Sequence, residues 1–257
     1  MASNESWEKI FKDHGINDHD FNKSPFTIDS KMIKESTQVF KKTAQKEVRL
    51  LCKQDSRKDR PQVFIDNGLF LLPIKNGVYS IIKGEGYIDI PKIDCDIEKH
   101  ESILDFCLDT SKTGDSEMQH LDYAYATSLI RTFMNDNSLV LTIRGRKYTP
   151  KINFNVGKFS IYTESVQTEV DAGYEGKKQV VLIEAKNSKT KDTIIRQLYY
   201  PFRQWQKYTD KKVVCLFFER DKKTEVYNIW QFEFTDINNY NSISLVRTAR
   251  YKIICKN

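Results

Sequence analysis

The sequence predicts an α/β protein with one mixed sheet (an α+β arrangement), preceded by an N-terminal segment of helices and a β-hairpin. In the second half, apolar residues recur at helical spacing, then in strand-like runs, then again at helical spacing and in a further strand-like run. In the first half, an Asn76-Gly77 pair separates two apolar runs, which is the strongest short-range signal of a hairpin. At 257 residues and 39% hydrophobic content, the chain is long enough for a core domain with a smaller module.

The N-terminal segment is expected to span residues 1–95, as an accessory region that recognises a partner. Asp29 or Ser30 fits the cap of its second helix, because short polar side chains accept hydrogen bonds from the first free backbone N–H groups. Helices are expected around residues 7–11, 30–40 and 44–52, and the hairpin at residues 68–82.

The second domain is expected to span residues 96–257. Residues 97–115 are expected to begin as a helix and to end as a loop, and a longer helix should cover residues 116–133. Arg144-Gly145-Arg146 is expected to form a basic turn. Strands are expected at residues 138–143, 152–162, 166–170, 180–186, 212–220 and 225–234, with a helix at residues 194–205 that is kinked at Pro201.

The strongest chemical signal lies between residues 166 and 186. Asp171 ends a strand pattern and precedes an expected turn at residues 172–176, while Glu184 and Lys186 end a strongly apolar strand. Side chains alternate along a strand, so Glu184 and Lys186 should share one face and Ala185 should lie on the other. Two carboxylates and a lysine on neighbouring strands are suited to hold Mg²⁺ beside a phosphodiester.

A structural ion pair at a strand end is the alternative interpretation of Glu184 and Lys186. The same acid-x-Lys spacing occurs elsewhere in polar or turn-like surroundings, where solvated surface charge explains it. Those triplets are Asp29–Lys31, Glu175–Lys177, Asp210–Lys212 and Asp221–Lys223. Only Glu184–Lys186 follows an apolar run of the kind buried on both faces, and charges are rarely buried unless they are paired or bound to metal.

In these positions the chain resembles the PD-(D/E)XK nuclease superfamily, and in its wider pattern a type II restriction endonuclease. The motif of that superfamily is an Asp at a strand end followed, on the next strand, by Glu-x-Lys. Asp171, Glu184 and Lys186 match it, whereas Val170 replaces the proline that often precedes the Asp. The similarity runs from near Ser116 onward.

The resemblance implies a restriction-endonuclease-like αβββαβ core and a Mg²⁺-dependent enzyme, with Mn²⁺ as a substitute. Such an enzyme hydrolyses double-stranded DNA at a specific short site, leaves 5′-phosphates and acts as a homodimer. Asp171 and Glu184 would bind the metal, together with the backbone carbonyl of Ala185. Lys186 would orient or deprotonate water, helped by a pKa lowered by burial and the metal. Glu117 would either add a further acid or stabilise a helix N-terminus.

Other polar residues are candidates for a supporting role. Glu169 and Gln167 share the face of Asp171 if their strand is regular, although surface exposure is an equal alternative. Basic side chains on two loops and on the helix after Lys186 are candidates for phosphate contacts, with solvated surface as the alternative. The candidates for DNA binding are Lys53, Arg57, Lys58, Arg60, Arg144, Arg146, Lys147, Arg196 and Arg203.

Composition narrows the function classes further. The net charge of +6 is compatible with a polyanionic partner. Five cysteines without a Cys-x-x-Cys pair favour reduced thiols, and so a bacterial or viral cytoplasm. No apolar run reaches the length of a membrane span, so no membrane partner is expected. Two alternatives stay open: another nuclease with this core (repair, junction-resolving or RecB-like), and a DNA-binding module whose nuclease core is degenerate.

Overall fold

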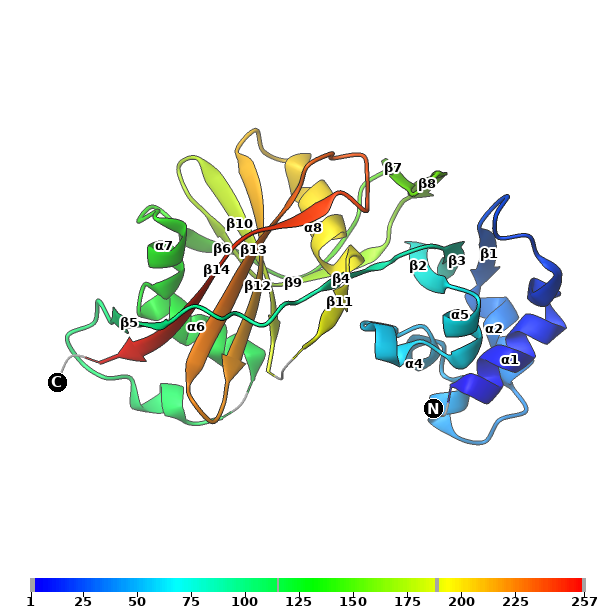
Figure 1. Ribbon diagram of the computed structural model, residues 1–257, viewed down its shortest axis with the longest axis horizontal. Coiled ribbons are helices and arrows are strands. Elements are labelled where there is room, and N and C mark those ends of the chain that lie inside the picture. The colour runs from blue at the N-terminus through cyan, green and yellow to red at the C-terminus, as the bar shows by residue number, and fades with distance from the viewer. Residues whose placement is uncertain (1–2, 115, 188–189, 256–257) are drawn as a thin grey trace.

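The computed structural model describes residues 3–114, 116–187 and 190–255 and shows a small N-terminal domain beside a larger domain (Figure 1). The small domain packs short helices against one side of a three-stranded sheet with the strand order β1-β3-β2. Its elements are α1 (Asn4–Asp13), β1 (Phe26–Asp29), α2 (Ser30–Thr37), α3 (Thr43–Lys46), α4 (Val48–Leu51), α5 (Gln62–Asp66), β2 (Leu69–Lys75) and β3 (Val78–Lys83).

Local sequence signals explain several of these elements. The side chain of Asp29 accepts hydrogen bonds from the backbone N–H groups of Lys31 and Met32, so it is the N-cap of α2, as expected. The hairpin β2–β3 turns at Asn76-Gly77, where Gly77 has a φ of +72°. A glycine adopts this left-handed conformation without steric cost, which confirms the expected hairpin.

The β2–β3 hairpin is buried on both faces and joins the two domains. Side chains on one face pack with Trp7 and the other helical residues of the small domain. Side chains on the opposite face, such as Phe70, extend the core of the larger domain, where the Phe70 ring stacks near that of Tyr240. The two domains therefore share apolar packing as well as a covalent connection.

The larger domain is built on a seven-stranded mixed sheet, which confirms the α/β (α+β) class. In sheet order its strands are β5 (Ile97–Glu101), β14 (Ile243–Ile254), β13 (Val226–Phe234), β12 (Lys212–Asp221), β10 (Gln179–Lys186), β9 (Gln167–Glu175) and β6 (Val140–Tyr148). Helices α6 (Glu117–Ala126) and α7 (Leu129–Met134) cover one face and α8 (Arg196–Gln206) covers the other (Figure 1). Smaller pairs are formed by β7 (Ile152–Val156) with β8 (Phe159–Thr163) and by β4 (Tyr87–Asp89) with β11 (Asp192–Ile194).

The expected order of helix, three strands, helix and strand is present around the centre of this sheet. It is formed by α6–α7, β6, β9, β10, α8 and β12, with the β7–β8 hairpin inserted between β6 and β9. β9 pairs antiparallel with both β6 and β10, and β10 pairs parallel with β12 across the α8 connection. The parallel pair requires such a crossover, which α8 provides.

Four sequence expectations for parts of the larger domain outside the candidate site were wrong. Residues 97–101 form the edge strand β5, because parallel pairing with β14 outweighs their helical pattern. Residues 144–146 do not turn but continue β6, since they remain paired with β9. The single strand expected at residues 152–162 is a hairpin, and the helix expected at residues 116–133 is interrupted at Ser128, whose φ is +69°.

The structure also places the domain boundary earlier than residue 95. Tyr87, Ile90 and Ile93 are buried in the core of the larger domain, and β4 pairs with β11 of that domain. β4 and β11 lie between the main sheet and the small domain (Figure 1). Among the described residues, no helix is both long and apolar enough to cross a bilayer.

Candidate functional site

Asp171 and Glu184 occupy facing positions on the antiparallel strands β9 and β10. Ala172 pairs with Ile183, so Asp171 and Glu184 come next along their strands. Oδ2 of Asp171 accepts a hydrogen bond of 2.8 Å from the backbone N–H of Ala185. The structure therefore brings the predicted Asp and the predicted Glu-x-Lys segment together.

Asp171 lies in the middle of β9 at a β-bulge rather than at a strand end. As β6 runs from Ile143 to Gly145, the antiparallel β9 runs back from Gly173 to Val170, so β9 contains one extra residue between these two paired positions. The expected turn at residues 172–176 is wrong, because β9 continues to Glu175. Bulges redirect side chains and are common beside active sites. Here, Val170 and Ala172 are two residues apart but pack into different hydrophobic cores.

Glu184 and Lys186 form a close ion pair at the end of β10. Nζ of Lys186 lies 2.5 Å from Oε1 of Glu184, as expected for side chains on one face of a strand. Glu184 is buried, and this burial raises the pKa of its carboxyl to about 7, although the ammonium of Lys186 opposes the shift and Asp171 adds to it. A carboxylate at this position is therefore held at an electrostatic cost.

The other two groups of the site also have shifted pKa values. Burial raises the pKa of Asp171, against the hydrogen bond from Ala185 and the charge of Lys186. Burial is the largest single influence on Lys186 and lowers its pKa, but Glu184, Asp171 and Glu117 together raise it by more, so the net pKa lies above the ordinary value. Burial therefore acts on the lysine pKa in the expected direction, but the neighbouring carboxylates together outweigh it.

Glu117 lies beside this group at the first residue of α6. Its Oε1 accepts a hydrogen bond of 3.2 Å from the backbone N–H of Asn187, directly after the Glu-x-Lys segment. Ser116 caps the helix by accepting from the backbone N–H of Gln119. Glu117 is thus near the strand end and at a helix N-terminus, so both interpretations of this acid stay open.

The donor set of the site fits a hard divalent cation. Mg²⁺ is commonly held by one or two carboxylates together with substrate phosphate and water. Asp171 and Glu184 offer two such carboxylates. Burial raises the pKa of both, and the charge of Asp171 further raises that of Glu184, a cost that a cation would offset. Within the described residues, no group of three His, Cys, Asp or Glu side chains converges in the way of a site held by protein alone. Any bound cation would therefore need ligands from substrate or solvent.

The site opens into a cleft of about 560 Å³ between the two domains. Charged side chains line it from both sides. From the small domain these are Arg49, Lys53, Asp55 and Lys75. From the larger domain they are Glu117, Glu169, Asp171, Glu184, Lys186 and Arg196. Gln167 also lines the cleft, so both supporting candidates on β9 reach it.

The predicted DNA-binding residues are distributed over several places. Lys53 and Arg196 line the cleft, and Arg196 pairs with Asp55 across the domain junction at 3.1 Å. Lys58 and Lys147 are exposed. Arg203, on α8, instead donates hydrogen bonds to the carbonyl of Ile237 and to the hydroxyl of Tyr199.

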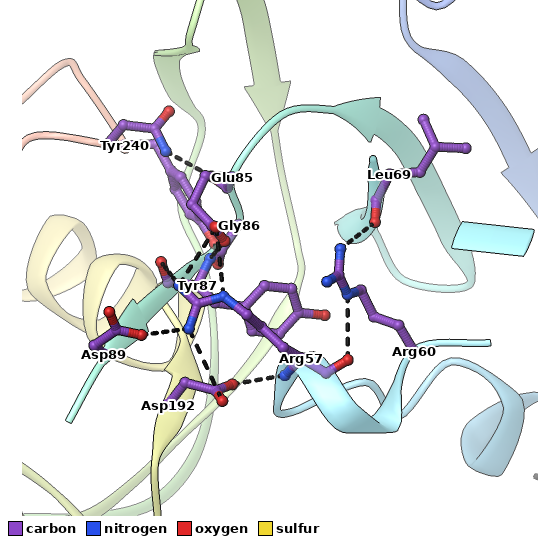
Figure 2. Close-up of polar contacts among 10 residues, drawn as sticks. Arg57, Arg60, Leu69, Glu85, Gly86, Tyr87, Asp89, Asp192 and Tyr240 are labelled. Carbon is purple, nitrogen blue, oxygen red and sulfur yellow. Dashed lines mark hydrogen bonds and ion pairs between the residues drawn. The ribbon is translucent and has the colours of Figure 1, made fainter. Parts of the chain in front are cut away.

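Two of the predicted arginines lie at the domain junction (Figure 2). The guanidinium of Arg57 contacts Asp89 at 2.5 Å and its backbone N–H donates to Asp192 at 2.6 Å. Arg60 donates to the carbonyl oxygens of Arg57 and Leu69. The guanidinium of Arg57 bridges the two domains and that of Arg60 bonds within the small domain, so the predicted role of both in DNA contact has no support from their position.

The remaining two predicted arginines have acidic partners within the larger domain. Arg144 pairs with Asp122 of α6, and its charge opposes the rise that burial causes in the pKa of Asp171. Arg146 pairs with Glu169 at 3.3 Å, where both side chains are mostly exposed. The basic segment of β6 therefore lies next to the cleft without lining it.

Sequence reasoning missed three charged residues of the cleft. Arg49 is on α4, Asp55 follows it in the connecting loop, and Lys75 is the last residue of β2. Lys75 precedes the Asn76-Gly77 turn, which was the only local signal near it. Their position at the site results from the packing of the small domain on the larger one.

Family models match the chain in two consecutive parts. A domain of unknown function, DUF6996, matches residues 4–81, and a second domain of unknown function, DUF6997, matches residues 82–252. The change from one to the other falls at the end of β3, close to the structural boundary. No curated protein and no solved structure matches the chain. Since the second model covers more than half of its length, the chain belongs to the DUF6997 family.

Proposed function

We propose that this protein is a Mg²⁺-dependent DNA endonuclease of the type II restriction kind, with a PD-(D/E)XK site. The observation that carries the proposal is the meeting of Asp171, Glu184 and Lys186 on neighbouring strands at the base of an interdomain cleft. The helix and strand order around them supports it, because it agrees with the αβββαβ core that the resemblance implies.

The residues of the site have separate roles in this proposal. Asp171 and Glu184 hold the cation through carboxylate oxygens, with the backbone carbonyl of Ala185 as a further candidate. A divalent cation there polarises a phosphoryl oxygen and lowers the pKa of bound water. Lys186 orients water or neutralises charge that develops on the phosphate oxygens. Its ammonium can leave Glu184 once the cation offsets the carboxylate charges.

A DNA-binding protein with an inactive core is the second candidate. The 2.5 Å ion pair between Lys186 and Glu184 agrees with it as well, because a purely structural pair would show the same contact. The two candidates differ in one outcome: only a nuclease breaks phosphodiester bonds.

The test is cleavage of supercoiled plasmids and genomic DNA with Mg²⁺, with Mn²⁺ and with EDTA. We expect wild-type protein to give discrete fragments with 5′-phosphates, and Asp171→Ala, Glu184→Gln and Lys186→Ala to give none. Lys223→Ala is the matched control, because Asp221-x-Lys223 has the same spacing in a surface turn. A smear would indicate a nuclease without site specificity, and intact DNA with every cation would reject the proposal.

A restriction enzyme of this kind is expected to act as a homodimer, because two-fold symmetry matches a palindromic site and places one active site at each strand. Light scattering with and without DNA measures the oligomeric state. Double-strand breaks from a protein that stays monomeric on DNA would reject the dimer but not the nuclease.

A further inference from the structure

The two sides of the cleft have opposite charge. The small domain contributes three cationic side chains and one acid, a net charge of +2 with every group ionised. The larger domain contributes two cationic side chains and four acids, a net charge of −2. An acidic surface repels phosphate unless a cation is bound there, whereas the basic surface opposite attracts it.

Among the residues that the structure describes, Arg49 and Lys75 are the cations of the basic side without an acidic partner. Lys53 lies 3.8 Å from Asp55, which also pairs with Arg196. In the described part of the chain, neither Arg49 nor Lys75 forms an ion pair, and both are exposed. Their charge is therefore free to meet an anion that enters the cleft.

Lys75 is held in place by the fold. Lys75 ends β2, and the backbone carbonyl of Gly77 in the adjoining turn accepts a hydrogen bond of 2.8 Å from Ser30. At the base of the cleft, the hydroxyl of Tyr200 on α8 donates to the carbonyl of Pro73 on β2 at 2.8 Å. The hairpin that carries Lys75 is thus fixed against the helix that packs beneath the site, so the basic side keeps its distance from the acids.

We infer that the small domain completes the active site, with Arg49 and Lys75 holding the DNA phosphate backbone across the cleft from Asp171 and Glu184. This inference rests on the proposed function for its substrate. It differs from the recognition role expected of the N-terminal segment, because these contacts position phosphates and carry no base preference. The acidic side binds the cation and the basic side binds the strand.

The experiment measures DNA binding without cleavage. A fluorescein-labelled 20-base-pair duplex of mixed sequence is titrated with protein in EDTA, and fluorescence anisotropy gives Kd at several salt concentrations. Each phosphate contact adds about 0.9 to the slope of log Kd against log salt. We expect Arg49→Ala and Lys75→Ala each to lower the slope by about 0.9, and the double variant by about 1.8.

Two control variants remove a charge of the same domain away from the cleft. The controls are Lys46→Ala and Lys83→Ala. Lys46 is on α3, before Arg49, and Lys83 is at the end of the hairpin farthest from Lys75. Neither residue lines the cleft, so both should keep the wild-type slope. Far-UV circular dichroism and urea unfolding show whether each variant is folded.

The outcomes separate the inference from the proposed function. If folded Arg49→Ala and Lys75→Ala keep the wild-type slope while wild-type protein cleaves DNA, the inference is wrong and the nuclease stands. If their slopes fall as expected but wild-type protein cleaves no DNA, the cleft binds a DNA backbone and the nuclease proposal is wrong. If the slope falls equally in the control variants, the effect comes from the total charge of the protein and not from the cleft, and the inference is wrong.

Discussion

The backbone N–H of Ala185 donates a hydrogen bond of 2.8 Å to Oδ2 of Asp171, and this bond joins β9 to β10 at the centre of the site. The acceptor is the carboxyl that the proposed nuclease needs for its cation. The donor is the buried residue between Glu184 and Lys186. One side chain therefore has a structural task and a proposed chemical one, and substitutions of Asp171 can separate the two.

Asp171→Ala and Asp171→Asn are expected to differ in stability but not in activity. Alanine leaves the Ala185 N–H buried without its acceptor, which should lower the free energy of unfolding by about 1–3 kcal/mol. Asparagine keeps an acceptor oxygen and removes a carboxyl whose pKa is raised by burial, so it should unfold near the wild-type urea concentration. Both should abolish cleavage. Equal destabilisation of the two variants would show that the hydrogen bond has no structural role.

Gly173→Ala tests the close approach of β6 to β9 beside the bulge. A Cβ atom at Gly173 would lie 2.6 Å from Cβ of Ile143, and both atoms are fixed to strand backbones. The strands must separate to accept it, so we expect the free energy of unfolding to fall by about 1–3 kcal/mol. The exposed neighbour Thr142 is the control, and Thr142→Ala should change stability by less than about 0.5 kcal/mol. Urea unfolding measures both, and equal stability of the two variants would contradict the close contact.

The cysteines should differ strongly in reactivity. Burial raises the pKa of the Cys52 and Cys215 thiols to about 12, whereas Cys95 is exposed. Alkylation requires the thiolate, and at pH 8 only about one in 10⁴ thiols with a pKa of 12 is ionised. Iodoacetamide at pH 8 should therefore label Cys95 well before Cys52 and Cys215, as followed by peptide mass spectrometry.

The same labelling in urea provides the control for the cysteines, because unfolding should make all five react at similar rates. A raised thiol pKa lowers the fraction of thiolate, and therefore the rate of alkylation, at every pH below that pKa. Native protein in which Cys215 reacts as fast as Cys95 would contradict its burial.

The parts of the site that the sequence predicted are those encoded by local patterns. Glu184 and Lys186 share a face because of strand alternation alone, and the apolar run before them marks a buried strand. The Asn76-Gly77 hairpin and the Asp29 cap are equally local. In each case, neighbouring residues determine the structure without reference to distant segments.

The parts that were missed depend on pairing between distant segments. Asp171 lies within β9 because the strand continues beyond it in pairing with both β6 and β10, which no local pattern reveals. β5 is a strand because β14 pairs with it, and β14 itself was not predicted. Arg49 and Lys75 reach the cleft only because one face of the β2–β3 hairpin packs into the core of the larger domain.

Arg57→Ala tests the junction that fixes the cleft. The guanidinium of Arg57 lies 2.5 Å from Asp89 and 3.4 Å from Glu85, and it also donates to the carbonyl of Tyr87. Its removal leaves acids of the larger domain without their cation, but Asp89 and Glu85 are mostly exposed and solvent offsets part of the loss, so we expect the free energy of unfolding to fall by about 1 kcal/mol. Arg57→Lys should recover only part of this loss, because one ammonium cannot reproduce the several donors of a guanidinium.

Lys58→Ala is the matched control for Arg57, since it removes the same charge from the next residue, which is exposed. It should change the free energy of unfolding by less than about 0.5 kcal/mol. The junction also predicts a change in dynamics: Arg57→Ala should speed proteolysis of the connection around residues 84–95, and Lys58→Ala should not. If the two variants unfold at one urea concentration and are cut at one rate, apolar packing by the β2–β3 hairpin alone holds the domains together, and Arg57 becomes available for the DNA contact first expected of it.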